Sequence, residues 1–201
     1  MTPEQIQSLE YETILSWVKT GSSVLDLGCG DGTLLALIVK EKSARAQGIE
    51  ISEQAIYQCV AKGLSVFHED IDGGLSDYSN HSFDYVILHQ SLQQVKKLDN
   101  VLTEAMRIGR RVIVGIPNFA HYHARIQIFF KGRTPVTPSL PYEWHDTPNL
   151  HFLSILDFTR YCQGRGFQIE KKAFVGERGR VTIFPNLFAL TGIFLIRNPE
   201  I

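Results

Sequence analysis

The sequence predicts an α/β fold in which a mainly parallel sheet carries helices on both faces. Strand-like apolar runs alternate with helical runs between residues 24 and 116, and this alternation implies right-handed crossover connections. A glycine-rich segment lies between the first predicted strand and the helical run that follows it. The chain has 201 residues, of which 44% are hydrophobic and 20% charged, so we expect one domain over residues 1–201.

The predicted elements follow one another without an internal repeat. A capping box formed by Thr2 and Gln5, with Pro3 between them, predicts a helix to about Thr20, and Gly21 ends it. A further helix is expected around the apolar run 34–38, and others at about 53–62, 98–108, 119–131 and 154–164. Strands are expected at 24–27, 46–51, 64–68, 83–88, 111–116, 167–175 and 188–196.

Residues at about 119–152 are expected to form an insertion. Its helix, 119–131, carries Phe119, Tyr122, Ile126, Phe129 and Phe130 on one side, which would suit an element that faces a partner. The segment 133–149 holds four of the eight prolines and should be stiff but not helical. Tyr142, Trp144 and His145 in this segment, together with Tyr122, are candidates for substrate or partner contacts; packing of the loop and ordinary loop hydrogen bonding are the alternatives.

Charge and cysteine content narrow the partners. The net charge of −1 favours neither nucleic acid nor an anionic membrane surface, so small molecules or proteins are expected. The three cysteines are far apart, which argues against disulfides and a zinc site and fits a cytoplasmic protein. The first twenty residues do not resemble a signal peptide, and the apolar stretch 181–196 is too interrupted to span a membrane.

The glycine-rich segment is the predicted cofactor loop. Gly28, Gly30 and Gly32 follow a GxGxG spacing, whereas NAD sites typically have GxGxxG, and Asp26 precedes them on the strand. This pattern favours S-adenosylmethionine (SAM), with Asp26 meeting its ammonium group directly or through water. Loop amides, including those of Cys29 and Asp31, and the helix N-terminus would favour its carboxylate. A turn that only connects two elements is the alternative.

Two later strand ends extend the predicted site. Glu50 lies twenty residues after Gly30, where an acidic side chain can accept hydrogen bonds from ribose hydroxyls. Asp70 is expected to accept from the adenine amino group, between apolar walls formed by Ile51 and Ile71; a turn residue is the alternative.

His89 and Gln90 should lie beside the methionine part of the cofactor. His89 is the best candidate for a proton acceptor, with contact to cofactor or substrate as the alternative role. Methyl transfer from a sulfonium is an in-line displacement that depends mainly on positioning, so no catalytic residue is assigned. No metal is expected, because His121 and His123 would point in different directions on a helix.

The glycine loop, Glu50, Asp70 and the segment after residue 83 resemble class I SAM-dependent methyltransferases over residues 14–118. More narrowly, the chain resembles the methionine biosynthesis protein MetW family. The stretches that carry the resemblance are 21–32, 83–88, 91–93, 116–119, 132–158 and 185–187. The chain departs from the family at His89, His145 and Gly115-Ile116, where serine, tyrosine and serine-phenylalanine are expected.

The resemblance implies a Rossmann-like fold whose seven-stranded, mainly parallel sheet has one antiparallel strand. It also implies SAM as cofactor, S-adenosylhomocysteine as product, and cytoplasmic action in methionine biosynthesis with homoserine O-acyltransferase. Two functions remain open: a SAM-binding subunit that acts with the acyltransferase, and an active methyltransferase with a small or carrier-bound substrate. A third, an NAD-linked oxidoreductase, is disfavoured by the GxGxG spacing.

Overall fold

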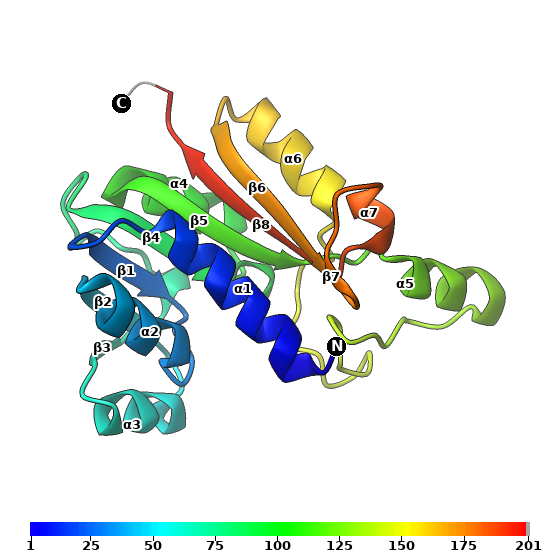
Figure 1. The fold of residues 1–201 in the computed structure, drawn as a ribbon, viewed down its shortest axis with the longest axis horizontal. Coiled ribbons are helices and arrows are strands. Elements are labelled where there is room, and N and C mark those ends of the chain that lie inside the picture. The colour runs from blue at the N-terminus through cyan, green and yellow to red at the C-terminus, as the bar shows by residue number, and fades with distance from the viewer. Residues whose placement is uncertain (200–201) are drawn as a thin grey trace.

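The computed structural model describes residues 1–199 and contains one eight-stranded sheet (Figure 1). The strands lie in the order β3-β2-β1-β4-β5-β8-β6-β7. Their bounds are β1 Ser23–Leu27, β2 Arg45–Glu50, β3 Ser65–His68, β4 Phe83–His89, β5 Gly109–Pro117, β6 Gln168–Gly176, β7 Gly179–Arg180 and β8 Thr191–Arg197.

Strands β1 to β5 pair in parallel, and β8 lies antiparallel between β5 and β6. This arrangement confirms the predicted mainly parallel sheet with one antiparallel strand inserted. The eighth strand, β7, has two residues and forms a hairpin with the end of β6. Because β7 is so short, it has no apolar periodicity that a sequence pattern could reveal.

Helices cover both faces of the sheet. Their bounds are α1 Pro3–Trp17, α2 Thr33–Lys42, α3 Glu53–Ala61, α4 Leu98–Ile108, α5 Tyr122–Ile126, α6 Ile155–Gly164 and α7 Pro185–Phe188. The described part of the chain contains no helix that is both long and apolar enough to cross a membrane.

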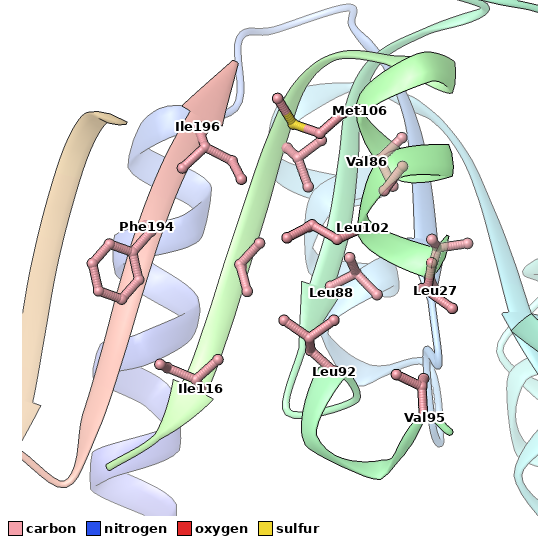
Figure 2. Close-up of a cluster of buried hydrophobic side chains, with 14 of the residues drawn as sticks. Leu27, Val86, Leu88, Leu92, Val95, Leu102, Met106, Ile116, Phe194 and Ile196 are labelled. Atoms are coloured by element: carbon pink, nitrogen blue, oxygen red, sulfur yellow. The ribbon is translucent and has the colours of Figure 1, made fainter. Parts of the chain in front are cut away.

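Side chains of β4 alternate between two hydrophobic clusters. Tyr85 and Ile87 pack with residues of α1 and α2, whereas Val86 and Leu88 pack with residues of α4 and α6. Figure 2 shows the second cluster, in which Leu102 and Met106 of α4 lie over β4 and β5. A strand buried on both faces is typical of a parallel sheet covered by helices. The parallel pairing of β1 with β2 and β4 places the carboxyl ends of these strands at one edge of the sheet.

Three predicted boundaries are wrong. The first helix ends at Trp17, and the last strand begins at Thr191 because Pro185 starts a helical turn, α7, over Pro185–Phe188. The helix expected at 119–131 begins only at Tyr122 and becomes π-helical at Gln127–Lys131. Its start is delayed because His121 adopts an extended conformation as the N-cap.

Candidate ligand-binding site

One cavity of about 880 Å³ lies at the carboxyl edge of β1, β2 and β4. Ligand crevices of parallel α/β sheets form at this edge. The cavity wall includes eleven of the twelve residues predicted to bind a cofactor: Asp26, Gly28, Cys29, Gly30, Asp31, Glu50, Ile51, Asp70, Ile71, His89 and Gln90. Residues from the ends of three strands therefore converge on one space.

The glycine loop approaches β4 too closely for a side chain at position 28. Gly28 has a φ of 77°, and a Cβ atom there would lie 2.7 Å from Cβ of Ser91. The amides of Gly28 and Cys29 both donate to the carbonyl of Ile49, which joins the loop to β2. Among residues 1–199, no acceptor lies within hydrogen-bond distance of the Asp31 amide, so it is available to an anionic group.

Glu50 holds the glycine loop against the end of β2. One carboxylate oxygen accepts from the amide of Gly30 at 2.8 Å, and the other accepts from the amides of Ile51 and Ser52 at 2.8 and 2.9 Å. These bonds use three of the roughly four lone-pair sites of a carboxylate. The side chain is thus fixed in place on the cavity wall and keeps acceptor capacity for a ligand hydroxyl.

Asp26 is a buried carboxyl group on the cavity wall, with 2% of its surface exposed. Burial raises its pKa to about 7, an effect that nearby His89 opposes and Glu50 reinforces. Burial and these two charges act on the carboxyl group, and no hydrogen bond to it from the described residues is among the influences on its pKa. A cationic ligand group at this position would supply the missing partner.

The raised pKa of Asp26 predicts a pH-dependent stability. Between pH 4 and 7 the folded chain keeps a proton that the unfolded chain has lost, so the free energy of unfolding falls as the pH rises through this window. We expect Asp26→Asn to stabilise the protein by about 2 kcal/mol more at pH 8 than at pH 5.

Urea unfolding at the two pH values measures this difference, and Asp84→Asn is the matched control. Ser23 donates to Asp84 through its amide and hydroxyl, which lowers the pKa of Asp84. Asp84 is therefore ionised in both the folded and the unfolded chain at pH 5 and at pH 8, and the effect of Asp84→Asn should be the same at the two pH values. An Asp26→Asn effect that is equal at both pH values would show that Asp26 is already ionised at pH 5.

Three predicted loop residues also have structural roles. Asp31 accepts from the amide and hydroxyl of Thr33 and pairs with Lys62 at 2.9 Å, which holds the start of α2. Burial raises the pKa of the Cys29 thiol, which keeps it protonated. Gly32 lies outside the cavity wall; a Cβ atom there would lie 2.7 Å from Sγ of Cys59, so this glycine permits close packing against α3.

The expected adenine end combines apolar and acidic groups. Ile51 is 60% exposed on the cavity wall, and Ile71 lies partly buried near it. Asp70 lines the same wall, and one of its oxygens accepts from the amide of Asp72 at 2.9 Å. Asp70 is therefore a turn residue that still presents its second oxygen.

His89 pairs with a residue that the sequence analysis missed. Its Nε2 lies 3.2 Å from a carboxylate oxygen of Glu10 on α1, and both side chains are almost completely buried. Its Nδ1 is buried without a hydrogen-bond partner and faces Gly115, where a Cβ atom would lie 2.2 Å away. His89 therefore joins α1 to the cavity wall, and its unpartnered ring nitrogen, Nδ1, lies against Gly115.

Because His89 lies so close to Gly115, substitutions at the two positions should have non-additive effects on the free energy of unfolding. Gly115→Ala should destabilise the protein by about 1 to 3 kcal/mol, because the added methyl group meets the imidazole in a closely packed region. In a His89→Ser background, the same change should cost much less. A double-mutant cycle from urea unfolding measures this coupling, and additive effects would contradict it.

Helix α1 supplies a wall of the cavity that the sequence analysis did not assign to it. Gln7, Glu10 and Tyr11 line the cavity, and burial together with Asp31 and Asp26 raises the pKa of Tyr11 to about 12. The one available sequence indication was an acidic residue, Glu10, at a position of the helix that is buried. Such a residue requires a partner, although the sequence does not identify it.

The four candidates for substrate or partner contacts lie in different places, and one of them is on the cavity wall. Tyr142 lines the cavity with Pro138 and Pro141. Trp144 and His145 are exposed, pack against each other and lie off the cavity wall. Tyr122 also lies off this wall and contacts Phe188 of α7.

Comparisons with known proteins agree with this fold. The family model described as methionine biosynthesis protein MetW matches residues 8–196. The bifunctional methionine biosynthesis protein MetXA/MetW of Rhodopirellula baltica is 34% identical over 199 residues, covering 92% of this chain and 32% of that protein. A ribosomal protein L11 methyltransferase of Burkholderia lata is 32% identical over 96 residues, covering 47% of this chain and 32% of the relative. The chain spans about a third of the length of these curated relatives.

Solved structures of SAM-dependent methyltransferases share the fold. One from Archaeoglobus fulgidus aligns with a TM-score of 0.72 at 15% identity and covers 98% of this chain and 95% of its own. Another from Mesorhizobium loti aligns with a TM-score of 0.70 at 16% identity and covers 94% and 98% of the two chains. At this level of identity the similarity establishes the Rossmann-like methyltransferase fold.

Proposed function

Because the chain belongs to the family described as methionine biosynthesis protein MetW, we propose that it binds SAM in the cavity at the carboxyl edge and serves methionine biosynthesis in the cytoplasm. The convergence of Asp26, the glycine loop and Glu50 on one cavity carries this proposal. The volume of this cavity, about 880 Å³, lies within the usual range of cofactor sites.

Each part of SAM has a matching group in the cavity. The ammonium group would meet the unpartnered carboxyl of Asp26, and the carboxylate would meet the free amide of Asp31 near the start of α2. Glu50 would accept from the ribose. The adenine ring would lie against Ile51 and Ile71, with Asp70 accepting from its amino group. Calorimetry with SAM tests this assignment.

We propose homoserine O-acyltransferase as the protein partner, with residues 119–152 as the insertion that faces it. The relative from Rhodopirellula baltica joins MetXA and MetW in one bifunctional protein. In the insertion, Phe129 and Phe130 are 81% and 76% exposed, and Ile126 and Ile128 are also exposed. Adjacent exposed apolar side chains of this kind are typical of protein interfaces.

The partner proposal predicts that Phe129→Ser combined with Phe130→Ser abolishes copurification of the acyltransferase. Tyr57→Ser, at an exposed aromatic residue of α3, is the matched control and should retain the partner. The acyltransferase rate should also depend on SAM only when this chain is present. Full copurification with the double variant would place the interface elsewhere.

An active methyltransferase is the second candidate function. The cavity extends from the strand ends to Pro138, Pro141 and Tyr142, which leaves a wall for a methyl acceptor. Methyl transfer needs mainly alignment of the acceptor with the sulfonium, so this function does not require a dedicated catalytic base. Incubation of the chain with methyl-labelled SAM and a cell extract tests this function through labelled product and S-adenosylhomocysteine formation.

A further inference from the structure

A second cluster of chemically reactive side chains lies outside the cavity. His121, His123 and Glu177 each offer one ligand atom, and these atoms all lie within 4.8 Å of one another. The histidines are at the start of α5, and Glu177 is in the turn between β6 and β7. The proposed cofactor role leaves all three residues unexplained.

The conformation of His121 brings the two histidines together. We expected them to diverge because residues two apart on a helix point in different directions. His121 is instead an extended N-cap residue, with φ −58° and ψ 145°, and the two ring centroids lie 5.2 Å apart. His121 is therefore not a helical residue, and the reason given for expecting the two side chains to diverge is wrong. Buried Asn118 fixes the preceding loop, since its side chain donates to Ala189 and accepts from Ala120.

The imidazole of His121 is fully buried, and its Nδ1 accepts from the amide of His123 at 3.4 Å. The backbone of Phe188 interacts with the ring, but within the described residues no hydrogen bond of good geometry reaches Nε2. Nδ1 of His123 lies 3.1 Å from a carboxylate oxygen of Glu177, and these two side chains are 43% and 35% exposed. One ligand is thus held in the protein, and the other two are open to an ion from solvent.

We propose that His121, His123 and Glu177 form a binding site for a divalent transition metal ion, for which Zn²⁺ is the best fit. Two imidazoles and one carboxylate form a three-ligand set that Zn²⁺ accepts, with water in the fourth position. The ion would connect the start of α5 to the β6–β7 turn. It would thereby fix the orientation of the aromatic segment that follows, residues 122–131, independently of SAM.

An ordinary ion pair between His123 and Glu177 is the competing explanation. It predicts no saturable metal binding and no role for His121. The metal site predicts that all three residues contribute to one binding event, so the two explanations differ in a direct measurement.

Untagged, metal-free protein should be titrated with Zn²⁺, and with Co²⁺ as a probe whose visible absorption reports the coordination geometry. We expect one ion per chain, a higher melting temperature with Zn²⁺, and nitrogen ligation of Co²⁺. His123→Gln and Glu177→Gln should each weaken binding at least about tenfold. His145→Gln, at an exposed histidine outside the cluster, should bind as the unaltered protein does.

Both test variants replace partly exposed side chains, so they should fold without the ion, and circular dichroism verifies this. Absence of saturable binding would overturn the proposal. Binding that remains unchanged in a folded variant carrying both His123→Gln and Glu177→Gln would overturn it as well, because the ion would then lie elsewhere.

Discussion

Replacement of Glu50 by alanine is expected to weaken SAM binding by about 1 to 3 kcal/mol, which is roughly a tenfold to hundredfold loss of affinity. The carboxylate would lose its bonds to the ribose, and the amides of Gly30, Ile51 and Ser52 would lose the acceptor that positions them. Isothermal calorimetry of the variant and the unaltered chain measures the effect.

Glu53→Ala is the matched control for this variant, since Glu53 is an exposed glutamate in the first turn of α3 and lies off the cavity wall. Glu50→Gln keeps the size of the side chain but removes its charge and one acceptor, so its affinity should fall between those of the other two proteins. If Glu50→Ala binds SAM with unchanged affinity, the ribose must lie elsewhere.

Gly28→Ala should destabilise the folded protein by about 2 to 5 kcal/mol. A left-handed conformation costs a residue with a side chain about 1 to 2 kcal/mol, and the contact with Ser91 should add about 1 to 3 kcal/mol. Gly30→Ala separates the two effects, because Gly30 has a φ of 56° but no neighbouring atom within 4 Å of the added methyl group. Urea unfolding provides both free energies.

Ser91→Gly combined with Gly28→Ala should recover part of that loss, since it removes the side chain that the new methyl group meets. The recovery is limited because Ser91 also donates to the carbonyl of Leu27. Equal destabilisation by Gly28→Ala and Gly30→Ala would contradict the importance of close packing between the glycine loop and the residues after β4.

Local sequence patterns are sufficient for most of the fold. The N-cap Thr2, the bounds of α4 and the run of parallel strands depend on neighbouring residues, so they were predictable. The convergence of the strand ends on one cavity was also predictable, because the carboxyl ends of adjacent parallel strands must lie at one edge. The position of Glu50 beside Gly30 follows from the pairing of β1 with β2.

Contacts between distant segments were not predictable. The pairing of Glu10 with His89 depends on how α1 packs across the sheet, and no local pattern records that angle. The approach of Glu177 to His123 depends on a two-residue strand and on the extended conformation of His121. Gly32 was assigned to the cofactor because of its spacing, whereas the structure places it against Cys59 and Leu64.

Calorimetric titration of the unaltered chain with SAM, and separately with NAD, tests the central claim most directly. The arrangement of Asp26, the glycine loop and Glu50 predicts that one SAM binds per chain and that NAD does not bind. Binding of NAD without binding of SAM would contradict the proposed function.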